Sequence, residues 1–599
     1  MCGIAGIIET NPGPADALHA KLTALNAAMK HRGPDDEGVW ISPSGTSGLA
    51  HVRLSILDLS SAGHQPMSTA DGGLHITFNG EIYNFRELRS ELEREGMTFA
   101  THTDTEVLLR LYQKEGEAML ARLRGMFAFA IWDERRQRCF LARDPMGIKP
   151  LYYTQRGGRL AFASELRPLQ QVGLTTREID PAALMRYFKT GSVAEPQTLL
   201  MDVHCLEAGH YLLWEAGRLV KRRYWQVEFH SEAMTAEQAV SEVRAALLDT
   251  TRAHFVSDVP VGIFLSGGID STALAALARA VGQQDIATFS IGVDDLSLDE
   301  SSAARRTAEH FGTRHEEMRL DGETARHEFT RFLRAMDQPS IDGFNTHTVA
   351  AFARERGMKV VLSGLGGDEM FGGYKSFDAV PRLAAGARAA RFLPGITQAS
   401  GWLLERYSPA NRVRRVGSLL RSAGSLRDAY GCFRGIFSIY EARLLAASYL
   451  HCSPRDIHPA PQHDLLAADP RDAVSECELR FYMRNQLLKD SDVMSMAHGL
   501  ELRVPLVDQA LFRRLARVPA ALRLRSGKQM LLEAVPEIPS WVSQAPKRGF
   551  VFPFEKWLGQ GWGGAFARAT ARAPFKNPTW YQRWSIFMLD TWLERHGLL

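Results

Sequence analysis

An apolar run, Val259–Leu265, leads directly into a glycine turn and then into an alanine-rich helix, Ser271–Val281. A helical pattern over Ala236–His254 comes before this unit, and a second apolar run, Ile286–Val293, comes after it. Strands and helices that alternate in this way are typical of a parallel sheet covered by helices. We therefore predict that the chain after about residue 235 forms a doubly wound α/β domain, with a helical C-terminal part.

The turn between the strand and the helix is predicted to bind phosphate. It reads Ser266-Gly267-Gly268-Ile269-Asp270-Ser271. A glycine turn that ends a strand and starts a helix presents backbone N–H groups to an anion, and the helix dipole favours the same charge. The turn lacks the Gly-Lys-Ser/Thr ending of a Walker A loop. It is therefore a phosphate site of another kind.

The first part of the chain has a different pattern. Short apolar runs are separated by Gly, Asp and Asn turn signals, as packed antiparallel sheets require. These runs are Ile4–Ile8, Leu74–Phe78, Met126–Trp132 and Cys139–Ala142, with helical periodicity between them at Ala17–Met29, Phe85–Glu95 and Thr105–Glu115. We predict two domains, residues 1–220 and 235–599, with a junction near residues 215–235.

Composition excludes several classes of protein and partner. The formal net charge is +3, so nothing electrostatic calls for nucleic acid or an anionic membrane. The six cysteines include no CxxC pair, which fits a reducing cytosol. No stretch approaches the ~20 apolar residues of a membrane span, and no signal peptide is visible. We therefore expect a cytoplasmic protein that acts on small molecules.

Cys2 is a candidate nucleophile. A small residue at position two allows removal of the initiator methionine, which would give Cys2 a free α-amine. That amine has an ordinary pKa of about 7.7–8.0, so it can accept the thiol proton and serve as the nucleophile's own base. On position alone, a cysteine buried in an N-terminal strand is an equally good interpretation.

Four further segments favour the nucleophile. They are His31-Arg32-Gly33-Pro34-Asp35, Arg53-Leu54-Ser55-Ile56, Phe78-Asn79-Gly80-Glu81-Ile82-Tyr83-Asn84 and Thr103-Asp104-Thr105-Glu106. Behind Cys2, their order and spacing resemble the class II glutamine amidotransferases, which hydrolyse glutamine to glutamate and ammonia. The resemblance implies an N-terminal nucleophile fold, an αββα sandwich of antiparallel sheets.

The same resemblance implies roles for single residues. Asn79 and the Gly80 N–H would stabilise the oxyanion of the thioester reaction. Arg53 and Asp104 would hold the α-carboxylate and α-ammonium of glutamine, and Glu81 would line the same pocket. Taken alone, Asn79-Gly80 is only a hairpin turn and Arg53 only a surface charge.

The glycine turn of the second part resembles the Ser-Gly-Gly-x-Asp-Ser signature of ATP pyrophosphatases. Three further segments resemble the synthetase half of glutamine-hydrolysing asparagine synthetases: residues 363–374, 495–508 and 546–550. The implied ATP-binding residues are Leu265, Ser266, Gly267, Gly268, Asp270, Ser271, Ile291, Ser363 and Gly364. Asp270 and Asp368 would hold Mg²⁺. Lys547 would be a catalytic cation that neutralises phosphate charge, although alone it reads as a solvated lysine.

The glycine loop within residues 363–374 differs from the sequence that is usual in that family. Relatives usually read Gly-Glu-Gly-Ser/Ala-Asp-Glu, whereas this chain has Leu365 in place of the first Glu. The resemblance predicts glutamine-dependent synthesis of asparagine from aspartate, with ATP, Mg²⁺ and a homodimeric state. Leu365 keeps open the same chemistry on another carboxylate, such as an envelope-polysaccharide uronic acid or a secondary-metabolite precursor. A non-catalytic scaffold is a third interpretation.

Overall fold

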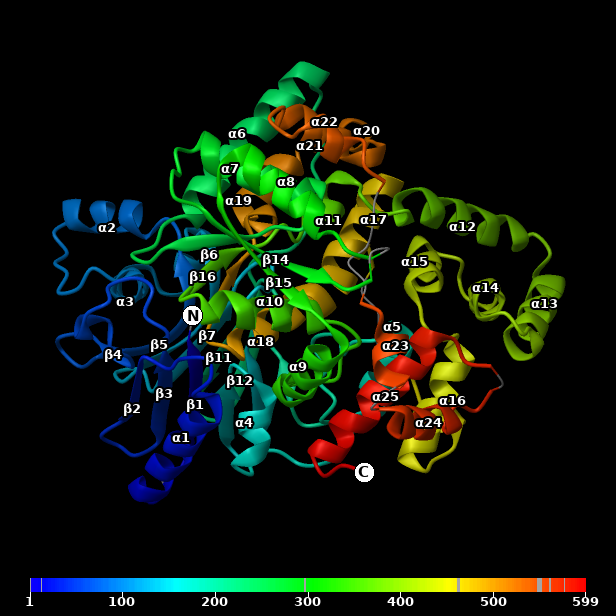
Figure 1. The fold of residues 1–599 in the computed structure, drawn as a ribbon. Helices are drawn as coiled ribbons and strands as arrows, with labels where there is room; N and C mark the ends of the chain where they lie inside the picture. Colours follow the sequence, from blue (N-terminus) through cyan, green and yellow to red (C-terminus); the bar gives the residue numbers. More distant parts are fainter. Residues whose placement is uncertain are drawn as a thin grey trace.

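The computed structural model describes residues 2–11, 13–295, 298–460, 464–546, 552–559, 562–575 and 577–599. Two six-stranded sheets come first in the chain, a five-stranded sheet follows, and helices make up most of the rest. Figure 1 shows most strands in the left half of the molecule and the helices of residues 376–450 and 554–595 in the right half. The α/β multi-domain class predicted from the sequence is confirmed.

The first two sheets are antiparallel. One has the order β10-β8-β9-β1-β3-β2, and the other has the order β12-β11-β7-β6-β5-β4. Their strands are β1 (Gly3–Glu9), β2 (Asp36–Ile41), β3 (Ser47–Arg53), β4 (Met67–Ser68), β5 (Leu74–Ile82), β6 (Gly125–Asp133), β7 (Arg138–Arg143), β8 (Tyr152–Arg156), β9 (Arg159–Ala163), β10 (His204–Cys205), β11 (His210–Glu215) and β12 (Arg218–Arg223). Alternate residues of the two sheets, such as Ile4 and Ala128, pack face to face in one core.

Helices cover both outer faces of this sandwich. α1 (Ala15–Met29) packs Leu22 and Leu25 against the first sheet. α2 (Phe85–Arg94) and α3 (Asp104–Glu115) cover the second. The resulting four layers are the predicted αββα sandwich.

The third sheet is parallel throughout, with the order β15-β14-β13-β16-β17. Its strands are β13 (Val261–Phe264), β14 (Ala287–Val293), β15 (Arg314–Leu320), β16 (Val360–Leu362) and β17 (Glu501–Arg503). α6 (Ala236–His254) and α7 (Ile269–Ala280) pack on one face, and α10 (Phe344–Glu355) packs on the other. The strand order reverses between β13 and β16, and open α/β sheets bind ligands at such a point.

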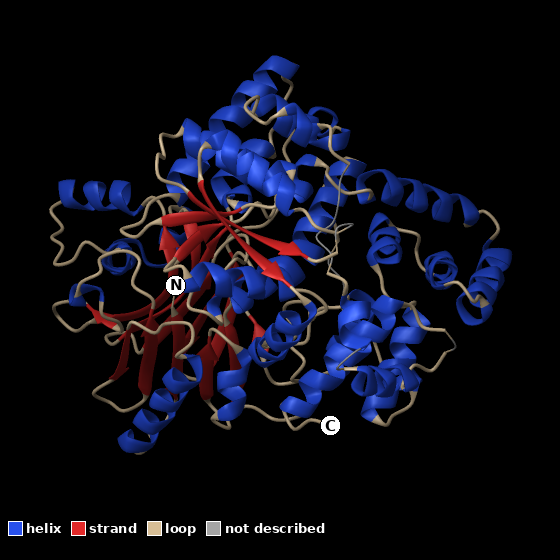
Figure 2. Ribbon diagram, viewed as in Figure 1, coloured by secondary structure: helices blue, strands red, loops and turns tan. Residues whose placement is uncertain are grey.

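Some of the remaining helices lie above the parallel sheet, and a second group lies to the right of it (Figure 2). The remaining helices are α4 (Leu166–Gln171), α5 (Pro181–Thr190), α8 (Ser301–Phe311), α9 (Gly322–Ala335), α11 (Gly367–Phe371), α12 (Ser376–Ala390), α13 (Pro394–Tyr407), α14 (Asn411–Arg421), α15 (Leu426–Arg434), α16 (Ile439–Leu450), α17 (Pro470–Cys477), α18 (Lys489–Met496), α19 (Gln509–Leu515), α20 (Ala520–Arg523), α21 (Gln529–Ala534), α22 (Ser540–Ser543), α23 (Phe554–Gly559), α24 (Gly563–Ala571) and α25 (Trp580–Arg595). A π-helix, η4 (Glu478–Leu488), joins α17 to α18.

The first and last parts of the chain share a core. In α5, Tyr187 donates a hydrogen bond to the Ser585 carbonyl of α25 at 2.8 Å. Trp592 donates to the Asp337 carbonyl at 3.0 Å. None of the described helices combines the length and apolar character that a membrane span needs.

Candidate functional site

The first centre lies where the start of β1 meets the last part of β5. Cys2 precedes β1, and its backbone N–H donates to Asn79 Oδ1 at 3.0 Å. The Cys2 side chain is buried, and this burial raises the pKa of its thiol, while the Arg53 charge lowers it. A buried thiol needs a base at hand to become a nucleophile, which is the role expected of the freed α-amine.

Asn79 and Gly80 have the features of an oxyanion site. Asn79 is fully buried, and its Nδ2 donor has no hydrogen-bond partner among the described residues. An unpaired buried donor is costly unless a ligand uses it. Gly80 has φ +156°, and a Cβ there would lie 2.1 Å from the Met126 carbonyl oxygen. Only glycine therefore fits this position.

Arg53 and Asp104 face the same cavity as Cys2. The Arg53 guanidinium donates to the carbonyls of Ser60 at 2.9 Å and Leu57 at 3.2 Å, so a surface loop wraps around it. Asp104 begins α3 and accepts the Ile82 N–H at 3.0 Å. Burial raises the pKa of Asp104 to about 6. The cavity is lined by Cys2, Arg53, Leu54, Ile56, Leu57, Gly63, Gln65, Phe78, Gly80, Glu81, Thr103, Asp104 and Thr105.

Glu81 lines this cavity and also reaches the parallel sheet. Its Oε1 lies 3.4 Å from Arg503 Nη2, and Arg503 also pairs with Glu501 at the start of β17. Arg503 Nη1 donates to the His254 carbonyl at 2.8 Å. Burial, followed by the Glu501 charge, raises the pKa of Glu81 well above its ordinary value. Glu81 thus joins the first centre to the second domain, a contact that the sequence does not reveal.

The second centre lies between the ends of β13 and β16. The loop after β13 folds on itself, because Ser271 Oγ accepts the Ser266 N–H at 3.2 Å and donates to the Gly268 carbonyl at 3.2 Å. Gly268 caps α7, which begins at Ile269, two residues earlier than expected. Gly267 has φ +74°, and a Cβ there would lie 2.8 Å from Ala303. The N-terminus of α7 is therefore available to an anion.

The loop after β16 packs directly on the first loop. The Ser363 N–H donates to the Arg503 carbonyl at 2.9 Å. A Cβ on Gly364 would lie 2.9 Å from Asp270 Cβ, and one on Gly367 would lie 2.2 Å from Asp270 Oδ1. Glycine at both positions lets the two loops meet at the reversal of strand order.

Two carboxylates converge where the loops meet. Asp270 Oδ2 lies 2.5 Å and Asp368 Oδ1 lies 2.6 Å from the same atom, Lys528 Nζ. Lys528 is buried. Burial lowers the pKa of its amine, but the charges of the two carboxylates outweigh this effect, so the pKa is raised. Nothing in the local sequence marks Lys528, because its partners come from loops far away along the chain. Lys547 lies outside the described residues.

The pair of carboxylates fits Mg²⁺. Their ligand atoms are oxygens, and Mg²⁺ is commonly bound by one or two carboxylates together with substrate phosphates. In the described part of the chain, no site gathers three or more His, Cys, Asp or Glu side chains. A metal ion here would therefore need phosphate oxygens as further ligands.

The other sequence-predicted residues surround this centre. Leu265 is buried against Ala304 and Ala308 of α8, so it offers only its backbone to a ligand. Ile291 is buried near the end of β14. Leu365 is partly buried among the apolar residues that pack on the sheet.

Glu369 is a buried carboxyl beside Asp368. Burial, followed by the Asp368 charge, raises the pKa of Glu369 to about 8. The Tyr374 hydroxyl donates to its Oε1 at 2.9 Å. Its Oε2 has no hydrogen-bond partner among the described residues.

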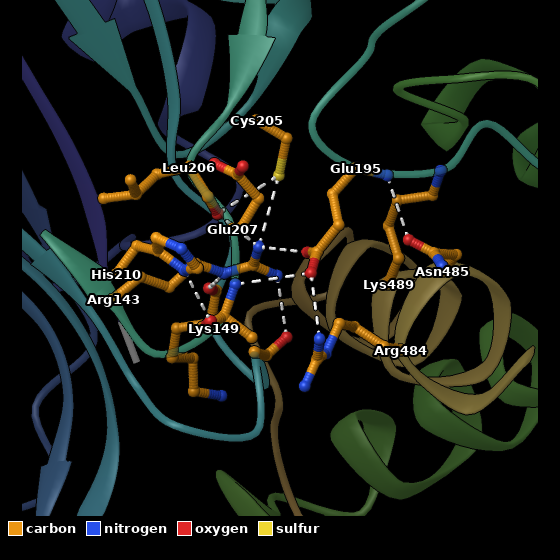
Figure 3. Close-up of polar contacts among 12 residues, drawn as sticks. Arg143, Lys149, Glu195, Cys205, Leu206, Glu207, His210, Arg484, Asn485 and Lys489 are labelled. Carbon is orange, nitrogen blue, oxygen red and sulfur yellow. Dashed lines mark hydrogen bonds and ion pairs between the residues drawn. The ribbon is translucent and has the colours of Figure 1, made fainter. Parts of the chain in front are cut away.

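Buried ion pairs hold the two domains together. Arg32 Nε donates to the Cys2 carbonyl at 3.1 Å, and its Nη2 lies 2.7 Å from Asp492 of α18. Figure 3 shows a second bridge, in which Glu195 lies between Arg143 and Arg484. Glu195 Oε2 is 2.7 Å from Arg143 Nη1, and Oε1 is 3.2 Å from Arg484 Nη1. Removing one partner of such a buried ion pair strongly destabilises the folded protein.

Comparisons with known proteins match a family model to each part of the chain. Residues 1–225 match the family model of the glutamine amidotransferase domain, and residues 242–578 match that of asparagine synthase. The glutamine-hydrolyzing asparagine synthetase 1 of Bacillus subtilis is 33% identical over 575 residues, 93% of this chain and 88% of its own length. A putative asparagine synthetase of Mycobacterium bovis is 35% identical, with 94% and 89% covered. Amidase chry2 of Gibberella zeae is 30% identical, with 93% and 90% covered.

Proposed function

Because this chain belongs to the glutamine-hydrolysing asparagine synthetase family, we propose that it releases ammonia at Cys2 and amidates a carboxylate at the β13–β16 centre. The chain is an ATP-dependent, glutamine-hydrolysing amidotransferase. The acceptor is the open question, since relatives that cover most of the chain include both asparagine synthetases and an amidase.

In the first reaction, the Cys2 thiolate attacks the side-chain amide carbon of glutamine. Asn79 Nδ2 and the Gly80 N–H stabilise the oxyanion, and ammonia leaves as the thioester forms. Arg53 holds the α-carboxylate and Asp104 holds the α-ammonium. Water then releases glutamate. The unpaired donor of Asn79 and the shared cavity support these roles.

In the second reaction, an oxygen of the acceptor carboxylate attacks the α-phosphorus of ATP, and pyrophosphate leaves. The loop from Ser266 to Ser271 holds the phosphates through its N–H groups. Asp270 and Asp368 would hold Mg²⁺, which would supply positive charge against the leaving pyrophosphate. Lys528 adds a second positive charge at the same place. Ammonia then attacks the acyl carbon, AMP leaves, and one proton is released.

The observation that carries the proposal is the convergence of Asp270 and Asp368 beside the helix N-terminus of α7. Aspartate is the acceptor that the family implies. A larger carboxylate is the second candidate, favoured by Leu365, which removes a carboxylate from the glycine loop.

The test is an assay of pyrophosphate, AMP and amide formation with ATP, glutamine and each candidate carboxylate. We expect pyrophosphate release to depend on the acceptor. Cleavage of ATP to ADP and phosphate would contradict the proposal.

A further inference from the structure

A cavity of about 710 Å³ lies among the helices. Its walls come from α5, α9, α10, α14, α15, η4, α23 and α25. Figure 1 shows α5, α23 and α25 close together in the right half of the molecule. Ligand pockets of roughly 300–1,000 Å³ accommodate drug-sized molecules. Aspartate is much smaller than such molecules and would leave most of this space empty.

A chain of contacts through Tyr374 and Glu369 links the wall of the cavity to Asp368. Tyr482 lines the cavity, and the Tyr482 ring lies 6.1 Å from the Tyr374 ring. The Tyr374 hydroxyl bonds to Glu369, the neighbour of Asp368. The cavity wall is therefore connected by side-chain contacts to the loop that carries Asp368.

The walls combine ring faces with hydrogen-bonding groups. Tyr482, Trp580 and Trp584 contribute aromatic rings, whereas Asp342 and Asn345 contribute a carboxyl and an amide. Aromatic rings bind a flat apolar face, and carboxyl and amide groups bind hydroxyls. This combination suits a hydroxylated ring better than a purely aromatic one, because hydroxyls can use the partly buried polar groups of the wall.

Two arginines of α14 add positive charge. Arg412 and Arg415 both line the cavity. Burial lowers the pKa of Arg415 most, and the positive charge of Arg412 also lowers it. Arg415 Nη1 donates to backbone carbonyls, including that of Cys432 at 2.7 Å. Among the ion pairs of the described residues, none includes either arginine. Two neighbouring guanidinium groups that form no ion pair with a carboxylate can bind an anionic group of a ligand.

We propose that this cavity is the acceptor subsite and takes a hydroxylated ring acid of the uronic type that carries a second anionic group. The inference rests on the proposed function and names its substrate class. The ring carboxylate is the group that attacks ATP and becomes the amide. The second anion binds Arg412 and Arg415.

The first experiment measures binding, independently of catalysis. Glucuronic acid 1-phosphate, galacturonic acid 1-phosphate, isophthalate and aspartate are titrated calorimetrically into the full chain carrying Cys2→Ala. We expect a sugar acid phosphate to bind more tightly than aspartate or isophthalate. Arg412→Ala should weaken that binding by roughly tenfold or more, since a charged hydrogen bond is lost. Arg412→Lys should restore part of it.

Two further variants make the result specific. Arg406→Ala removes an arginine that stacks over Trp402 and Tyr440 outside the cavity, and should leave binding unchanged. Tyr581→Ala removes an exposed ring from the cavity wall and should weaken sugar binding with little effect on folding. Equal binding in Arg412→Ala and the parent would overturn the assignment. Tighter binding of isophthalate than of either sugar acid would overturn the hydroxylated ring.

Pyrophosphate release separates this inference from the function on which it rests. Aspartate-dependent release without any binding of a sugar acid overturns the cavity assignment alone. Binding of a sugar acid without pyrophosphate release from any carboxylate overturns the proposed function.

Discussion

Single residues at the first centre carry one half of the chemistry. Cys2→Ala removes the nucleophile but leaves the β13–β16 centre intact. We expect glutamine-dependent amide synthesis to vanish, while synthesis from ammonium salts persists, because the thiol serves only to release ammonia. The measurement is amide formation from each nitrogen source with the same acceptor. Equal loss of both activities would mean that the two centres are not separable.

Asp104 predicts a pH dependence of glutamine binding. With a pKa of about 6, its carboxyl gains a proton and loses its charge as the pH falls through that value. The ion pair with the glutamine α-ammonium is then lost. The KM for glutamine should rise up to about tenfold per pH unit below the pKa, toward pH 5. Glutaminase kinetics between about pH 5 and 8 measure this effect.

Asp104→Asn is the matched control for this pH effect. Its KM should be high at every pH and show no step near the pKa of Asp104. A step that persists in Asp104→Asn would assign the titration to another group.

Asp270 carries the other half of the chemistry. Asp270→Asn should slow ATP cleavage to AMP and pyrophosphate by a factor on the order of 10² to 10⁴, while glutaminase turnover survives. Asp285→Asn is a suitable control, because Asp285 is exposed and pairs only at the surface with Arg314. Unchanged pyrophosphate release in Asp270→Asn would remove Asp270 from the metal site.

At the scale of elements, two loops at the reversal of strand order form the second centre. Gly367→Ala would place a Cβ 2.2 Å from Asp270 Oδ1, so the Asp270 carboxylate must move from its position beside Lys528. We expect at least a tenfold loss of ATP cleavage, with glutaminase activity retained. Gly386→Ala, in α12, meets no atom within 4 Å and should raise stability by about 0.5–1 kcal/mol. Full activity of Gly367→Ala would show that the loops are not tightly coupled.

The elements also show what sequence patterns can predict. The helix over Ala236–His254 has the predicted bounds, because a capping Thr235 and an amphipathic period define it locally. The glycine turn between β13 and α7 could be predicted, because few residues other than glycine fit its backbone conformation. The metal-binding role of Asp270 came from the family resemblance and stays a prediction. Lys528 and Arg503 could not be identified from the local sequence. Their roles arise from partners on distant loops, which only the tertiary structure brings together.

At the scale of the whole molecule, Arg503 lies between the two centres. Its side chain meets Glu81 beside Cys2, and its carbonyl accepts the Ser363 N–H at the nucleotide loop. Arg503→Met leaves Glu81 and Glu501 buried without their cation, so it should lower stability. In the folded variant, the number of glutamines hydrolysed per amide formed should rise severalfold. Ammonia that escapes to water is protonated and lost to the second reaction. The ratio of glutamate to amide product measures this coupling.

Glutaminase turnover without acceptor serves as the control for Arg503→Met. A ratio that equals that of the unmodified protein would show that Arg503 does not couple the centres. The division of the chain at residues 220 and 235 and the homodimeric state remain predictions.

The buried guanidinium of Arg32 limits how this protein can be rearranged by recombination. It ties the Cys2 carbonyl to Glu165 of its own domain and to Asp492 of the other. A first domain transplanted onto a foreign synthetase would keep the desolvated cation but lose one of its carboxylates. Removing one partner of a buried ion pair typically costs about 3–5 kcal/mol, a large part of a domain's stability. Functional chimeras must therefore exchange Arg32 and Asp492 as a unit.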